Sequence, residues 1–101
     1  MKTVVYGMLD EEKKRNLEMQ RLHRQEIEAL RKGSIVIKNR PSGKYYYLKY
    51  WKDGKTKTDY IGKDEMSIEK INQEIKKRKY LQGVLKRLKV EYQQISKIVK
   101  D

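Results

Sequence analysis

Hydrophobic and polar positions alternate in three different ways along this chain, and each pattern predicts a different element. Residues 10–32 are polar and helix-prone, with a thin apolar stripe and no glycine or proline. Residues 34–62 are rich in β-branched and aromatic side chains. Residues 67–100 return to helical spacing. The order predicts an α+β fold: a long helix, a three-stranded antiparallel β-meander and a long C-terminal helix. We expect a helical hairpin or coiled coil with the sheet at one end, in one domain covering residues 1–101.

The first predicted helix is weakly amphipathic. Acidic residues at 10–12 favour a helix N-terminus, and Gly33 is a typical stop residue. We expect the second half of this helix to pack and the first half to be exposed. The apolar stripe consists of Leu17, Met19, Leu22, Ile27 and Leu30.

The last predicted helix carries a stronger apolar pattern, with Ser67 as its expected N-cap. Ile68, Ile71 and Ile75 come first, and a later run is out of phase with them, so a bend near Gly83 is an option. The later run has coiled-coil spacing, which predicts antiparallel pairing with the first helix and leaves apolar surface for a homodimer or a host protein. Its residues, called the leucine seam below, are Leu81, Leu85, Leu88, Tyr92, Ile95 and Val99.

The middle segment predicts two hairpins. Pro41 and Gly43 lie in the first connection, and Asp53-Gly54 is a strong two-residue turn signal. That turn places Trp51 opposite Thr56, Lys49 opposite Thr58, Leu48 opposite Asp59 and Tyr47 opposite Tyr60.

Alternation along the strands then assigns side chains to two faces. We expect helices to cover the face with Leu48, and the other face to be open; the reverse assignment is the alternative. The covered face holds Tyr46, Leu48, Tyr50, Lys57, Asp59 and Ile61, joined by Ile35 and Ile37. The open face holds Tyr45, Tyr47, Lys49, Trp51, Thr56, Thr58 and Tyr60.

Charge changes what the open face suggests. The formal net charge is +12, which favours a polyanionic partner. Residues 33–63 contain eight basic and two acidic residues, or +6. Aromatic rings beside cations are typical of surfaces that hold a nucleic-acid backbone and touch bases. In the competing interpretation, Tyr and Thr only favour strands and lysines only keep the sheet soluble.

We predict nucleic-acid-binding residues on the open face, at its rim and on the last helix, where a solvated helix face is the alternative explanation. The face contributes Tyr45, Tyr47, Lys49, Trp51, Thr58 and Tyr60; the rim contributes Lys38, Arg40, Lys44, Lys52 and Lys55; the helix contributes Lys76, Lys79, Lys86 and Arg87.

Several residue types are scarce enough to exclude classes of chemistry. The chain has no cysteine, and its one histidine, His23, is expected at the surface. Carboxylates are scattered and no glycine-rich phosphate loop occurs. We therefore expect no enzyme, no catalytic residue, no metal and no cofactor. No apolar run predicts a membrane span or signal peptide, so a cytoplasmic location is expected.

The ordered motifs Gly33-Ser34-Ile35, Lys44-Tyr45-Tyr46-Tyr47-Leu48-Lys49-Tyr50, Asp53-Gly54-Lys55 and Tyr60-Ile61-Gly62-Lys63 resemble those of a family of small uncharacterised proteins from low-GC bacteria and their mobile elements. More loosely, the three-stranded sheet followed by a helix is similar to the arm-binding domains of integrases, which lay their sheet in the DNA major groove.

Two functions follow as leading hypotheses, and a self-assembling structural coiled coil is a third. The first is a small basic protein of a phage or mobile element that binds DNA or structured RNA. The second is a protein-interaction module, such as a phage-encoded inhibitor of a host RNA-guided nuclease or defence complex, which docks through the leucine seam and the sheet.

Overall fold

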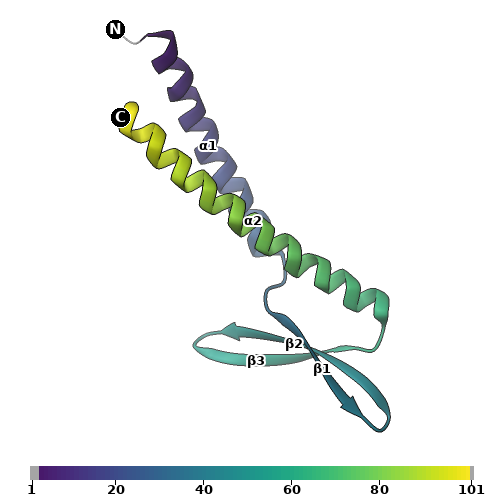
Figure 1. Ribbon diagram of the computed structural model, residues 1–101. Coiled ribbons are helices and arrows are strands. Elements are labelled where there is room, and N and C mark those ends of the chain that lie inside the picture. Colours follow the sequence, from purple (N-terminus) through teal and green to yellow (C-terminus); the bar gives the residue numbers. More distant parts are fainter. Residues whose placement is uncertain (1–2, 101) are drawn as a thin grey trace. The chain divides into compact units, whose positions relative to one another are not determined.

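The computed structural model describes residues 3–100 and contains five elements (Figure 1). They are α1 (Val4–Ala29), β1 (Ser34–Arg40), β2 (Gly43–Lys52), β3 (Lys55–Gly62) and α2 (Glu65–Ile98). The helix–sheet–helix order and the antiparallel sheet confirm the predicted α+β fold. The chain divides into two compact units. Leu30–Lys79 forms the sheet unit, and residues 3–29 and 80–100 form the helical unit. A single domain for the whole chain stays a prediction.

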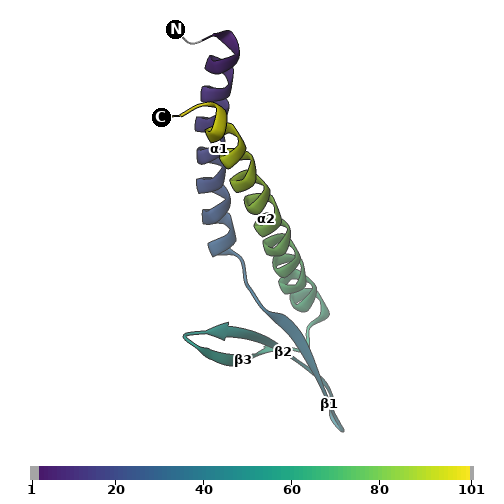
Figure 2. The same cartoon turned by 60° about the vertical axis from the view of Figure 1, so that its left-hand side comes forward.

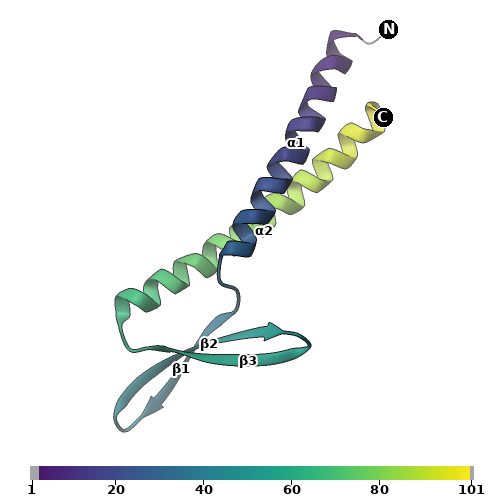
Figure 3. The same cartoon turned by 180° about the vertical axis from the view of Figure 1, so that it is seen from behind.

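In the helical unit, α1 runs antiparallel to the second part of α2 (Figures 2 and 3). Lys13 contacts Val99, and Asn16, one turn later on α1, contacts Leu88. α1 begins at Val4 instead of residue 10 and ends at Ala29. α2 is continuous through Gly83, so the helix does not break there.

The buried side of α1 is polar, which the sequence pattern did not predict. Lys13, Asn16 and Gln20 are 5%, 3% and 4% exposed, whereas Leu17 and Leu22 are 47% and 41% exposed. The expectation that the first half is exposed was therefore wrong. The second half does pack, as expected, and Ile27 of the apolar stripe is buried there at 7% exposed. The buried or half-buried residues on this side of α1 follow one another at 4-3-4-3-4 spacing, as in a coiled coil, but most of them are polar. They are Leu9, Lys13, Asn16, Gln20, His23 and Ile27. His23 is half-buried on this side of α1, not at the surface.

Hydrogen bonds make this polar seam tolerable, because a buried polar group without a partner is costly. Lys13 Nζ donates to the Val99 carbonyl over 3.2 Å and lies 5.4 Å from the centroid of the Tyr92 ring. Asn16 Nδ2 donates to the Leu88 carbonyl over 2.9 Å, and Gln20 Nε2 donates to Asn16 Oδ1 over 2.7 Å. We call Lys13, Asn16 and Gln20 the polar seam.

Opposite the polar seam, the leucine seam of α2 is partly covered. Leu81 and Val99 are buried. The four seam residues between them are half-buried. Less apolar surface is thus left on this seam than its sequence suggested, and a homodimer or a host-protein partner stays a prediction.

In the sheet unit (Figure 1), β2 lies between β1 and β3. The predicted register between β2 and β3 is confirmed. Trp51 pairs with Thr56, Lys49 with Thr58, Leu48 with Asp59 and Tyr47 with Tyr60. Asp53 and Gly54 have φ values of 52° and 76°, as a type I′ hairpin turn requires.

The covered face is also the one predicted. Leu48 on β2 clusters with Ile71 and Ile75 on the first part of α2, and Ile35, Tyr50 and Ile61 pack against this cluster. Ile37 shares the face but remains half exposed. The opposite face of the sheet is therefore the one that lies away from this core.

The predicted N-cap of α2 and the predicted stop of α1 also differ from the structure. Asp64, not Ser67, caps α2: its carboxylate accepts the Met66 amide over 3.3 Å and the Ser67 hydroxyl over 2.7 Å. Gly33 does not stop α1, which ends earlier. It has a φ of 118°, and a Cβ there would lie 2.3 Å from the Lys49 carbonyl oxygen. Its absent side chain lets β1 begin against β2.

Within residues 3–100, neither α1 nor α2 contains an apolar stretch of the length that crossing a membrane requires.

Candidate nucleic-acid interface

The open face extends over all three strands of the sheet. Register pairs Lys38 of β1 with Tyr45 and Val36 with Tyr47, and Tyr47 with Tyr60 of β3. Since side chains two apart share a face, Arg40 joins Lys38. The strand positions on this face include the cations Lys38, Arg40 and Lys49 and no carboxylate.

Three tyrosines form a cluster at the centre of this face. The Tyr60 ring lies 6.2 Å from the Tyr45 ring and 5.4 Å from the Tyr47 ring, centroid to centroid. The rings are tilted by 42° and 57°, within the range that aromatic pairs favour. We call Tyr45, Tyr47 and Tyr60 the tyrosine cluster.

Cations lie over these rings. Lys38 Nζ is 4.6 Å from the Tyr47 centroid, and the Arg40 guanidinium carbon is 5.2 Å from that of Tyr45. Lys63 Nζ lies 4.2 Å from the Tyr45 centroid. Attraction between a cation and a ring face contributes roughly 0.5–1 kcal/mol at exposed sites. The rings therefore favour positions of three positive charges over the open face.

Lys63 was not among the residues predicted for the site. The ladder between β2 and β3 shifts after Tyr60: Tyr47 pairs with Tyr60, but Tyr46 pairs with Gly62. The extra residue, Ile61, is a β-bulge, and it changes the face to which the next residues point. Lys63 consequently lies over Tyr45 instead of joining the covered face. The sequence contains one signal of this bulge, Gly62, because a glycine within a strand often marks an irregularity. Its φ of 105° is one that other residues rarely adopt.

The first hairpin loop is tied to the same cluster. The hydroxyl oxygens of Ser42 and Tyr45 are 2.6 Å apart, and Lys63 Nζ donates to the Ser42 carbonyl over 3.5 Å. The hydrogen bond with Ser42, followed by the effect of Lys63, lowers the pKa of Tyr45 from its ordinary value. The loop, Tyr45 and Lys63 thus form one connected group.

The other predicted residues are exposed but separate from the tyrosine cluster. Lys49, Trp51 and Thr58 lie further along the open face toward the Asp53-Gly54 turn. The remaining rim lysines lie near strand ends, with Lys52 paired to Lys55 and Lys44 paired to Asn39. On α2 the predicted basic residues are exposed, Lys76 and Lys79 in the sheet unit and Lys86 and Arg87 in the helical unit.

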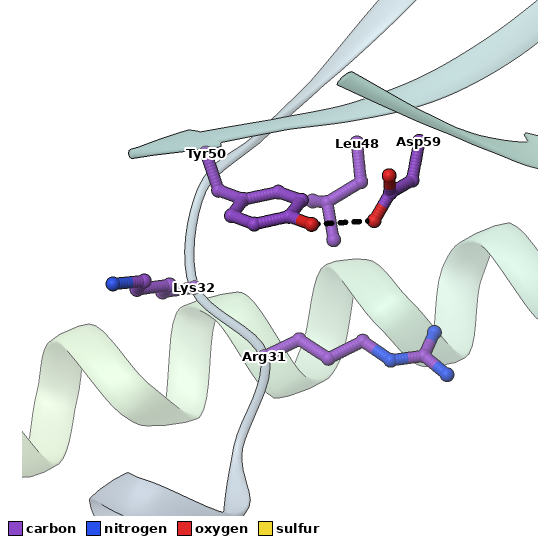
Figure 4. Close-up of a pocket in the computed structure, with 5 residues that line it drawn as sticks. All are labelled: Arg31, Lys32, Leu48, Tyr50 and Asp59. Atoms are coloured by element: carbon purple, nitrogen blue, oxygen red, sulfur yellow. Dashed lines mark hydrogen bonds between the residues drawn. The ribbon is translucent and has the colours of Figure 1, made fainter. Parts of the chain in front are cut away.

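The covered face keeps the acidic residue of β3. Tyr50 donates its hydroxyl to Asp59 Oδ2 over 2.8 Å, and this hydrogen bond raises the pKa of Tyr50 (Figure 4). Both residues, with Arg31, Lys32 and Leu48, line a pocket of about 260 Å³. Asp59 thereby places its negative charge on the side of the sheet opposite to the tyrosine cluster.

The chain is a small helix–sheet–helix protein whose sheet displays tyrosines and cations on one face. Residues 9–73 match the family described as domain of unknown function DUF6788, and the chain belongs to that family. The match covers all three strands and Lys63, and it ends inside α2 before the leucine seam. No curated protein and no solved structure is significantly similar to the chain.

Proposed function

We propose that this protein binds nucleic acid, either DNA or structured RNA, through the open face of its sheet. The observation that carries the proposal is a group of cations on the open face, among whose strand positions there is no carboxylate. Lys38, Arg40, Lys49 and Lys63 lie on the open face. Asp59 is hydrogen-bonded on the other. Cations grouped in this way attract phosphates, and no carboxylate among the strand positions of this face opposes them.

The tyrosine cluster has a specific part in this proposal. A lysine or arginine on a flexible stem loses side-chain entropy when it grips a phosphate. Contacts of Lys38, Arg40 and Lys63 with ring faces restrict these side chains before a ligand arrives. The proposed face is therefore partly organised for backbone contacts in the absence of its ligand.

The dimensions of β2 suit a nucleic-acid backbone. Tyr45 and Trp51 share the open face and are separated by about 20 Å at roughly 3.3 Å per residue. That length corresponds to about six base-pair steps of duplex at 3.4 Å each. The looser similarity to integrase arm-binding domains supports the same type of contact, with the sheet against a groove, and is an analogy of architecture. An origin in a phage or mobile element rests on the motif resemblance alone.

A charge-matched pair of triple variants tests the proposal. The variant K38A/R40A/K63A removes the three ring-held cations, and the control K70A/K77A/K89A removes three exposed lysines of α2. Both variants have the same net charge. Affinity for a duplex DNA and for an RNA hairpin is measured by fluorescence anisotropy over a range of salt concentrations.

If three phosphate contacts are lost, the slope of log affinity against log salt for duplex DNA falls by about 2–3 in the first variant only. Equal losses in both variants would mean that net charge alone drives binding. If the unmodified protein bound no nucleic acid at low salt, the proposal would be refuted. A single protein that co-purifies with the chain and stays bound after nuclease treatment would support the interaction-module hypothesis instead.

A further inference from the structure

Trp51 differs from the other aromatic residues of the open face because its ring is unoccupied. It is 62% exposed, and within residues 3–100 no aromatic ring or cation lies against it. In contrast, Tyr45 and Tyr47 each have a cation over the ring, and Tyr60 contacts both of them. The indole is thus the most exposed ring of the open face, and within the described part of the chain it carries neither a cation nor a second ring.

The residues around Trp51 favour an anionic occupant. Lys49 precedes it by two positions on the same face. Lys52 follows it directly and pairs with Lys55 across the turn. One carboxylate, Asp53, belongs to the turn itself. Lys49 lies on the face of the exposed indole, and Lys52 and Lys55 lie at the end of the same hairpin on its other side. An apolar ring with lysines this near combines a stacking surface with phosphate contacts.

The chemistry of base pairing then narrows the ligand. In a duplex, the flat faces of the bases are stacked on one another, and a protein reaches only their edges. A base that stacks on a tryptophan must be unpaired, as in a single strand, a loop, a bulge or an end. The separation of about 20 Å between Tyr45 and Trp51 along β2 allows at most about six stacked nucleotides between them.

We infer that Trp51 stacks on an unpaired base, so that the ligand of the open face is single-stranded or locally unpaired nucleic acid. The ring-held cations Lys38, Arg40 and Lys63 grip the phosphates of the same strand further along the sheet. This inference rests on the proposed function, because it assigns the class of nucleic acid that the same face binds.

Trp51 provides its own reporter, because it is the only tryptophan in the chain. Its fluorescence is titrated at low salt with a 20-mer of thymidines and, in parallel, with a blunt 20-base-pair duplex. We expect the single strand to quench the indole at saturation and the duplex to leave it nearly unchanged.

Affinity is then measured by anisotropy of labelled oligonucleotides for three variants. W51A should lose about 5- to 150-fold in affinity for the single strand, as expected for one stacked base, and less than about twofold for the duplex. W51F should retain part of the affinity, because a smaller ring still stacks. Y80A is the control, since Tyr80 is an exposed aromatic residue on α2 outside the open face. Circular dichroism verifies that each variant is folded.

The outcomes separate the inference from the function on which it rests. If no nucleic acid binds the unmodified protein, both fail. If nucleic acid binds but W51A weakens neither ligand, or weakens both equally, the inference fails and the proposed function stands. Selective loss of single-strand affinity in W51A, with Y80A unchanged, supports both.

Discussion

Asn16 offers the sharpest test of how the two helices pair. Its side chain is buried and makes two hydrogen bonds: Nδ2 donates to the Leu88 carbonyl, and Oδ1 accepts from Gln20. In N16A both bonds are lost, and the buried Gln20 amide loses its acceptor. At about 1 kcal/mol for a typical net hydrogen bond and 1–3 kcal/mol for an orphaned donor, the free energy of unfolding should fall by roughly 2–4 kcal/mol.

Replacing both partners should have a different result. N16L/Q20L removes the donor and the acceptor together and fills the space with apolar side chains, which is close to neutral for stability. The Arg24 guanidinium, which donates to Gln20 Oε1 over 3.0 Å, is on an exposed residue and can turn to water. The double variant should therefore be more stable than N16A. It should also lose a polar constraint on helix register, which light scattering would detect as a change in oligomeric state.

Thermal unfolding followed by circular dichroism measures these differences. For a chain of this size, 1 kcal/mol corresponds to a shift of about 4–8 °C in Tm, so N16A should melt roughly 8–30 °C lower. Q25A is the control, because Gln25 is an exposed polar residue on the same helix and its loss should change stability by less than about 0.5 kcal/mol. If N16A and Q25A melted together, the polar seam would not be buried in solution and the pairing described here would be refuted.

Two further predictions concern the sheet unit and α2. G33A should lower the free energy of unfolding by about 1–3 kcal/mol, because alanine is strained at a φ of 118° and its Cβ would collide with the Lys49 carbonyl. The control is G83A on α2, where a Cβ meets open space, and it should be neutral or slightly stabilising. Equal Tm values for the two variants would contradict the close approach of Gly33 to β2. Hydrogen bonds from the Ser67 hydroxyl and then the Met66 amide lower the pKa of Asp64. A lowered folded-state pKa gives stability that is present above the unfolded-state pKa and is lost as pH falls through the folded value. D64N should keep the cap but lack this acid-dependent loss in denaturant titrations between pH 6 and pH 2, and an unchanged pH profile would count against the role of the carboxylate.

The sheet was predictable because its information is local. Asp53-Gly54 permits one compact hairpin turn, and once the turn is set, the register and both faces follow from alternation. The bulge at Ile61 was not predictable in the same way, since it depends on how β3 leaves β2, and Lys63 was therefore missed. At the start of α2, Asp64 and Ser67 are both N-cap residue types, and only geometry shows that Ser67 donates to Asp64.

The first helix was predicted poorly for a physical reason. Apolar periodicity finds a buried face only when that face is apolar, and α1 buries Lys13, Asn16 and Gln20. Their burial depends on carbonyls and a ring from a helix more than seventy residues later in the chain. No pattern within α1 contains that information. The leucine seam of α2 correctly predicted that the two helices pair. It did not show which side of α1 lies against it.

The polar seam has a practical consequence for handling the protein. α1 partly covers the leucine seam of α2, although the side of α1 that does so is mostly polar. Removal of α1 would therefore expose apolar surface on α2 and little apolar surface on α1. A truncated form that starts near residue 30 would keep the sheet and would expose the leucine seam, from Leu81 to Val99, to solvent. Contiguous apolar surface of that kind promotes aggregation. Expression of the sheet by itself should consequently also remove the end of α2, from about residue 80 onward.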